Sequence, residues 1–168
     1  MTKTITIELL KKYDACKVQV AKFKELFGEE IIPTQELCLL HAQDFNFEWG
    51  RKLLDEQSQE AFDEDIAPSR KVYDEVIAPS RKVYDEVIAP ALKVFEESIA
   101  PYRKAFVEST APNMKAYKEV IAPDRKAFVE SIAPATKAYE EDIDPIRKSF
   151  AEAVAMAWFN AWENQNKS

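Results

Sequence analysis

Apolar and polar positions recur every eleven residues through most of this chain. From Pro68 to Pro145 a proline stands at each eleventh position. Counting from each proline, the third residue is always Lys, the fifth is always aromatic and the seventh is always Glu, while the ninth is Ile except at Thr110 and Val154. Because eleven residues make almost three helical turns, equivalent positions nearly superpose, and the pattern predicts an amphipathic helix.

The aromatic and Ile positions lie four residues apart and so share one face of the predicted helix, whereas the Lys and Glu positions share another face. We expect the apolar face to be an interaction surface. Its residues are Tyr73, Ile77, Tyr84, Ile88, Phe95, Ile99, Phe106, Tyr117, Ile121, Phe128, Ile132, Tyr139, Ile143 and Phe150.

The prolines leave two interpretations open. Each could begin a short helix, where its missing N–H costs nothing, or each could kink one continuous helix. The residue before proline is mostly Ala, a poor N-cap, and eleven residues leave little room for a helix and a reversal. We therefore favour one long helix curved by equally phased kinks, which at ~20° each would bend it by roughly 160°.

A helix of this length cannot bury its own apolar face. About 100 residues would run ~150 Å if straight, too extended for a self-contained core. We expect the face to meet a second copy, the N-terminal part of the chain, another protein or a lipid surface. Homo-oligomerisation is the default because most soluble oligomers are symmetric self-assemblies.

The two ends differ from the repeat, which gives three predicted regions: an N-terminal helical module over 1–56, the repeat over 57–155, and an aromatic cap and tail over 156–168. Within the module, Thr4 or Thr6 is a candidate N-cap, Gly28 is a candidate helix terminator, and Pro33 and Thr34 open the next predicted helix.

Three aromatic residues near the C-terminus, Trp158, Phe159 and Trp162, break the register of the repeat. They are expected to close the repeat or to dock on the N-terminal module. The alternative is a binding hot spot, where Trp is enriched.

Composition narrows the class of protein. Only 2 glycines among 168 residues favour an all-α fold. The net charge of -7 argues against a nucleic-acid partner held through phosphate contacts. No apolar run approaches the ~18 residues of a membrane span, and no signal-peptide core is evident at the start. We therefore expect a cytoplasmic protein in which Cys16 and Cys38 are reduced core residues.

Few residues of the chain could form a catalytic or metal-binding site. His41 is the one histidine and stands three residues after Cys38, but a structural zinc site requires four ligands. The Glu positions of the repeat form a surface ladder beside Lys, not a pair of carboxylates in different environments. We predict no catalytic, cofactor or metal site, and no enzymatic activity.

The stretch ITIELLKKYDACKVQVAKFKELFG, followed by FNFEWGRKLL, resembles a short N-terminal module of uncharacterised bacterial and phage proteins. The resemblance implies no enzymatic activity and suggests a phage or mobile-element accessory protein that acts on a host protein. The matching residues are Ala15, Cys16, Phe23, Phe27, Asn46, Trp49, Leu53 and Leu54.

These patterns favour a non-enzymatic interaction or scaffold protein, in which a curved repeat helix assembles with itself and clasps another protein. The alternative is a lipid-surface-binding protein, because the proline-punctuated repeat resembles that of exchangeable apolipoproteins. The net negative charge argues against this alternative, since interfacial helices usually carry Lys/Arg-rich polar faces.

Overall fold

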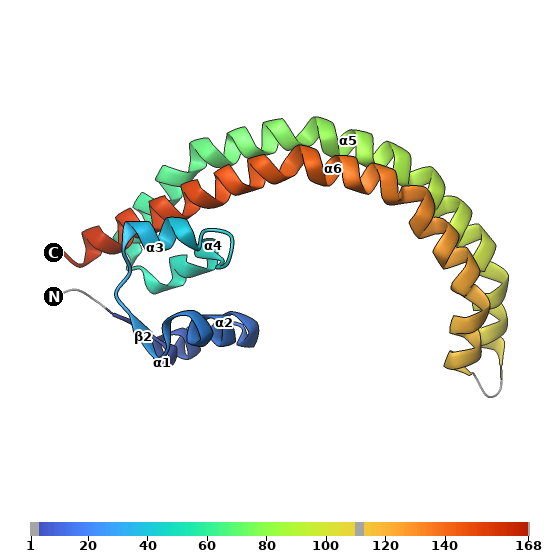
Figure 1. The fold of residues 1–168 in the computed structure, drawn as a ribbon, viewed down its shortest axis with the longest axis horizontal. Helices are drawn as coiled ribbons and strands as arrows, with labels where there is room; N and C mark the ends of the chain where they lie inside the picture. The colour runs from blue at the N-terminus through green and yellow to red at the C-terminus, as the bar shows by residue number, and fades with distance from the viewer. Residues whose placement is uncertain (1–3, 110–112, 168) are drawn as a thin grey trace. The chain divides into compact units, whose positions relative to one another are not determined.

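The chain folds almost wholly into helices, as its composition predicts (Figure 1). The computed structural model describes residues 4–109 and 113–167. In chain order the elements are β1 (Ile5–Thr6), α1 (Ile7–Lys12), α2 (Lys17–Phe27), β2 (Glu30–Ile31), α3 (Gln35–Leu40), α4 (Phe47–Gly50), the 3₁₀ turn η1 (Arg51–Leu53), α5 (Glu56–Glu108) and α6 (Met114–Gln165).

Helix α1 begins after Thr6, one of its two candidate caps, α3 begins after Thr34, and α2 ends at the predicted residue, whereas α1 and α3 end earlier than predicted, at Lys12 and Leu40. The side-chain oxygen of Thr6 accepts a hydrogen bond from the backbone N–H of Leu9 at 3.1 Å, and Thr34 caps α3 in the same way through Leu37 at 3.3 Å. Helix α2 ends before Gly28, whose φ of 75° and ψ of -135° favour glycine. These features mark the starts of α1 and α3 and the end of α2.

A two-stranded antiparallel pair was not predicted. In it Ile5 lies opposite Ile31 and Thr6 lies opposite Glu30. Each strand has only two residues, too few for the alternating apolar pattern that reveals a strand in a sequence.

The repeat forms two long helices instead of one. Helix α5 ends at Glu108 and α6 begins at Met114, and the two run side by side (Figure 1). The side-chain oxygen of Asn113 accepts hydrogen bonds from the backbone N–H groups of Lys115 and Ala116, at 3.0 and 3.1 Å. This is an N-cap, which marks the start of α6.

Seven prolines of the repeat lie inside these two helices, so at these positions the helix continues through the proline instead of breaking. Pro112 lies outside the described residues. Within α5 and α6 the prolines are Pro68, Pro79, Pro90, Pro101, Pro123, Pro134 and Pro145.

The fold divides into two compact units. The first, here called the head, comprises Met1–Asp74 and Ile146–Ser168; the second, the hairpin, comprises Glu75–Pro145. The core of the head brings together Phe23 of α2, Phe62 of α5 and Trp158 of α6. The hairpin consists of the remaining parts of α5 and α6, which bend together in Figure 1.

We expect Pro134→Ala to stabilise the protein, because alanine has the backbone N–H that proline lacks and can donate the missing hydrogen bond inside α6. The gain in the free energy of unfolding should be about 2 kcal/mol, after subtracting the unfolded-state entropy that proline removes. Urea unfolding followed by circular dichroism measures it. Pro33→Ala is the control, since Pro33 precedes α3 and its loss should bring no gain. A less stable Pro134→Ala variant would mean that the bend itself supports the packing of α5 on α6.

Candidate functional site

The aromatic residues of the predicted interaction face contact one another across the two long helices. In the hairpin the ring centroids of Tyr84 and Tyr139 are 4.8 Å apart. The other pairs are Phe95 with Phe128 at 5.0 Å and Phe106 with Tyr117 at 4.9 Å, and in the head Tyr73 with Phe150 at 4.6 Å. From one pair to the next, the aromatic residue lies eleven residues further toward the C-terminus of α5 and eleven residues nearer to the N-terminus of α6.

The isoleucines of the same face are buried to different degrees. Ile77, Ile99 and Ile143 are buried, whereas Ile88, Ile121 and Ile132 are half-buried. The apolar face therefore packs against the other half of the same repeat, which was not among the expected partners.

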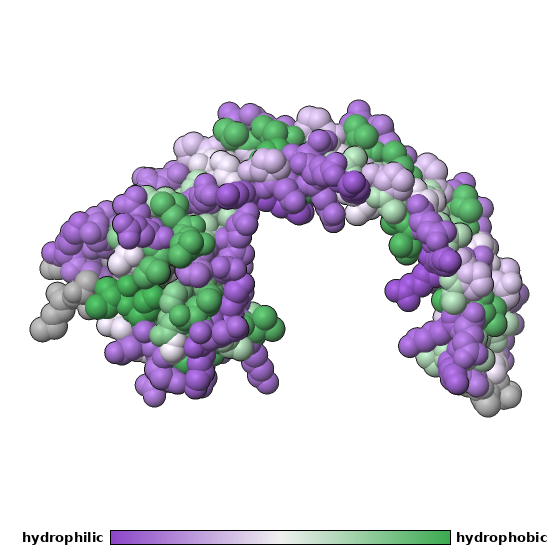
Figure 2. All heavy atoms as spheres, in the orientation of Figure 1, coloured by the Kyte–Doolittle hydropathy of each residue, from purple (hydrophilic) through white to green (hydrophobic). Residues whose placement is uncertain are grey.

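A second apolar row stays exposed on α5. In the hairpin it contains Val76, Val83, Val87 and Val94, with exposed fractions between 45% and 68%. Figure 2 shows separate apolar patches along the surface of the long helices. Exposed apolar side chains gathered in a row are typical of an interaction surface.

The predicted cap residues lie in the head. Trp158 and Trp162 are buried, their rings stack with centroids 5.3 Å apart, and Phe159 is half-buried beside them. The ring of Phe47 lies 5.5 Å from that of Trp158. These residues pack on the N-terminal module, which is the placement that the cap interpretation requires.

Gly50 allows the backbone of α4 to approach Trp158. A Cβ atom at this position would lie 2.8 Å from the indole nitrogen of Trp158, closer than packed atoms tolerate. The glycine is therefore needed for this contact, and no local pattern in the sequence reveals that need.

An apolar cavity of about 100 Å³ lies beside this contact in the head. The indole N–H of Trp158 is buried and has no acceptor among the described residues. An unsatisfied buried donor costs about 1–3 kcal/mol. The walls are formed by Ile5, Leu10, Ala15, Gln19, Phe23, Phe27, Ile31, Pro33, Leu37, Cys38, His41, Phe45, Asn46, Phe47, Trp49, Gly50, Leu53 and Trp158.

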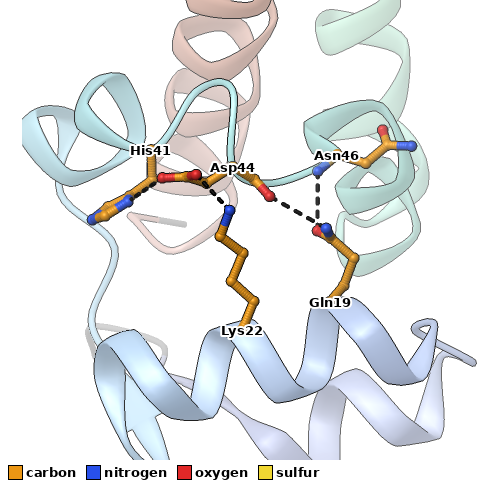
Figure 3. Close-up of polar contacts among 5 residues, drawn as sticks. All are labelled: Gln19, Lys22, His41, Asp44 and Asn46. Carbon is orange, nitrogen blue, oxygen red and sulfur yellow. Dashed lines mark hydrogen bonds and ion pairs between the residues drawn. The ribbon is translucent and has the colours of Figure 1, made fainter.

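A polar network connects α2 with the segment between α3 and α4 (Figure 3). The ammonium of Lys22 and the Nδ1 atom of His41 lie 2.5 and 2.8 Å from the two carboxylate oxygens of Asp44. The side-chain amide of Gln19 donates to the backbone oxygen of Asp44 at 3.2 Å, and its carbonyl accepts from the backbone N–H of Asn46 at 3.3 Å.

Hydrogen bonding and burial determine which of the side chains near the cavity are charged. Hydrogen bonds from Lys22 and then His41 lower the pKa of Asp44, so the carboxylate stays ionised. Burial raises the pKa of the Cys38 thiol to about 12, which keeps this cavity residue neutral. The network was not predicted because Lys22 and Asp44 are far apart in the chain and become neighbours only on folding.

The two cysteines differ in environment. Cys38 is buried, as predicted, but Cys16 is exposed, so the prediction of two core residues is wrong for Cys16. Cys16 directly precedes the first residue of α2, on the outside of the head. In the described part of the chain, no group of three or more His, Cys, Asp or Glu residues could hold a metal ion.

Neither long helix, nor any other helix within 4–109 and 113–167, is long and apolar enough to cross a membrane. Comparison with known proteins gives no match to a family model, to a curated protein or to a solved structure. The resemblance of the N-terminal module to bacterial and phage proteins therefore stays a prediction.

The Asp44 network should make stability depend on pH. Because the pKa of Asp44 is below its ordinary value of 3.8 in the folded protein, its contribution is full above that value and is lost as pH falls through the folded pKa. At pH 7, Asp44→Asn should lower the free energy of unfolding by about 0.5 kcal/mol, as for an exposed ion pair.

Urea unfolding at pH 7 and at pH 3 checks this expectation. The difference between wild type and Asp44→Asn should shrink at pH 3, while the exposed Asp85→Asn control should differ little from wild type at either pH. An equal deficit at both pH values would show that the carboxylate charge does not support the network.

Proposed function

We propose that the protein is a non-enzymatic scaffold in which the hairpin is a spacer of fixed length, attached to the head through α5 and α6. The observation that carries the proposal is the constant register of the aromatic pairs, because each pair joins one repeat unit of α5 to one unit of α6. Length is then set by the number of matched units.

The spacer proposal has a physical basis in the similarity of the units. Removing one unit from each helix leaves the remaining aromatic pairs in register and shortens the hairpin by about 16 Å, since a helix rises 1.5 Å per residue. Removing one unit from α5 alone leaves an aromatic residue of α6 without its ring partner. The outer surface needs little change, because Lys and Glu pair within five of the units, as Lys126 and Glu130 do at 3.7 Å.

We propose the valine row of α5 (Val76, Val83, Val87 and Val94) as the surface on which a second copy packs. Its members repeat at the eleven-residue spacing, which places apolar side chains along one line of a helix and suits a facing helix of the same period. The exposed Lys–Glu ion pairs Lys82–Glu86 and Lys93–Glu97 lie on the same helix at 3.9 Å and give it a mixed charge.

A lipid surface is less well supported as the partner. The aromatic rings that would enter a lipid surface face each other in pairs, and the polar positions mix Lys with Glu instead of being rich in Lys and Arg. Binding of a further protein, a cytoplasmic location and a phage or mobile-element origin stay predictions.

The spacer proposal is tested by a matched deletion of residues 79–89 and 134–144, which removes the Tyr84–Tyr139 pair whole. We expect the same helicity per residue, a cooperative unfolding transition and a maximum dimension reduced by up to about 16 Å, measured by circular dichroism and small-angle X-ray scattering. The deletion of 79–89 alone is the comparison, and it should unfold at lower temperature. If the single and matched deletions behaved alike, the aromatic register would not set the length.

The valine row is tested by Val83→Glu combined with Val94→Glu. Wild type should self-associate as its concentration rises in analytical ultracentrifugation, and the double variant should stay monomeric with an unchanged circular dichroism spectrum. Val129→Glu, at an exposed position of α6 outside the row, is the matched control and should associate as wild type does. A monomeric wild type at every concentration would overturn this assignment.

A further inference from the structure

The hairpin pairs two stretches of one repeat whose units are alike. Its ring pairs follow each other at steps of eleven residues on both helices, from Tyr84 with Tyr139 to Phe106 with Tyr117. Because every unit presents an aromatic residue at the same position, the apolar face of α5 fits the α6 of a second copy as well as its own. The chain's own α6 is favoured because it is joined to α5.

The repeat keeps its phase through the sequence that joins the two helices. Helix α5 ends at Glu108 and α6 begins at Met114, yet Phe106 and Tyr117 are eleven residues apart, as neighbouring aromatic residues are elsewhere in the repeat, and Pro112 is also in phase. A connection that only reverses the chain does not require this spacing. A sequence in phase can instead continue as one helix with its apolar face unbroken, since eleven residues make almost three turns.

The head is also built from residues near both ends of the chain. The ring of Trp158 in α6 lies 5.5 Å from that of Phe47, and the side-chain oxygen of Gln165 accepts from the backbone N–H of Asp55 at 2.8 Å. Neither contact requires the two parts to belong to one chain. The α6 of a second copy could therefore complete the head with the same side chains.

We propose that the chain has a second form, a dimer in which two copies exchange α6. In this dimer the apolar face of each α5 pairs with the α6 of the other copy, and the repeat continues through the connecting sequence without reversing. Each head then consists of the N-terminal part of one copy and the end of α6 from the other. The aromatic pairs and head contacts of the monomer all recur, but between copies. Exchange of an identical element is a low-cost route to a dimer.

The balance between the two forms is set at the connection. Contacts elsewhere are the same in both, so the forms differ in the residues near 109–113 and in their dependence on chain concentration. The N-cap of Asn113 favours the hairpin, because it satisfies backbone N–H groups of Lys115 and Ala116 that need a partner where α6 begins. A short connection favours exchange. Either form persists once made, because conversion requires α5 and α6 to separate along their length.

The exchange does not rest on the proposed valine row, and the two kinds of association can be told apart. Packing through the valine row should reverse on dilution and should be lost when Val83→Glu is combined with Val94→Glu. The exchanged dimer should survive both treatments, because its contacts are those of α5 with α6. It would give the scaffold two heads in place of one.

A shorter connection provides the first test. Deleting residues 109–119 removes one period, so Phe106 comes to stand eleven residues before Phe128 and the repeat stays in phase. We expect this variant to be a dimer at micromolar concentration by light scattering, with the helicity per residue of wild type by circular dichroism. The matched control, a flexible Gly/Ser segment inserted between Thr110 and Ala111, lengthens the connection and should be monomeric. A shortened chain that is monomeric or unfolded would overturn the proposal.

Refolding of the wild-type chain provides the second test. The chain is unfolded in urea, refolded at micromolar or millimolar concentration, diluted and separated by size. We expect a dimer after refolding at the higher concentration, and the same dimer from the variant that combines Val83→Glu with Val94→Glu. When ¹³C-labelled and unlabelled chains are refolded together, a nuclear Overhauser effect between Tyr84 of one chain and Tyr139 of another identifies the exchange. Refolding to monomer alone at millimolar concentration, or a dimer that lacks this contact, would exclude it.

Discussion

The contact between aromatic rings across α5 and α6 is the interaction on which the long part of the molecule depends. An amphipathic helix of about fifty residues needs a partner for its apolar face, and here the partner is the other half of the same repeat. Because both helices carry an aromatic residue every eleven positions, antiparallel pairing places ring against ring in each unit, from Tyr84–Tyr139 to Phe106–Tyr117. Rings at these centroid distances add favourable contact energy to the burial of apolar area. The prolines do not prevent this pairing, since they recur with the same period and disturb each unit in the same way.

The head is organised by a different contact, that of Trp158 with the backbone at Gly50. The missing side chain of the glycine lets the indole approach α4, and the small residues Ala155 and Ala161 of α6 lie in the same core. The end of α6 is also held to the start of α5, where the side-chain oxygen of Gln165 accepts from the backbone N–H of Asp55 at 2.8 Å. The cavity lies among these contacts, and the apolar character of its walls comes from segments that are distant in sequence.

Much of the local structure could be predicted because it depends on neighbours in the chain. The caps at Thr6 and Thr34, the helix end before Gly28 and the Lys–Glu spacing of the repeat are satisfied within a few residues. The division of the repeat into two helices could have been found as well: Thr110 replaces Ile, and Asn113, a favourable N-cap, follows Pro112. The regularity of the repeat led to the prediction of one continuous helix, because a period of eleven is equally compatible with a single helix and with two that fold back on each other.

Helical conformation, the apolar and charged faces and the regular placement of the prolines could be read from the chain alone, since these follow from spacing along the backbone and from local hydrogen bonds. Which face meets which depends on the folded chain. Antiparallel pairing put Phe95 against Phe128, and folding of the head brought Lys22 to Asp44 and Gly50 to Trp158. The physical reason is that burial of apolar area is non-directional: the pattern requires a partner for each apolar face, but the shapes and distances of the folded chain select it.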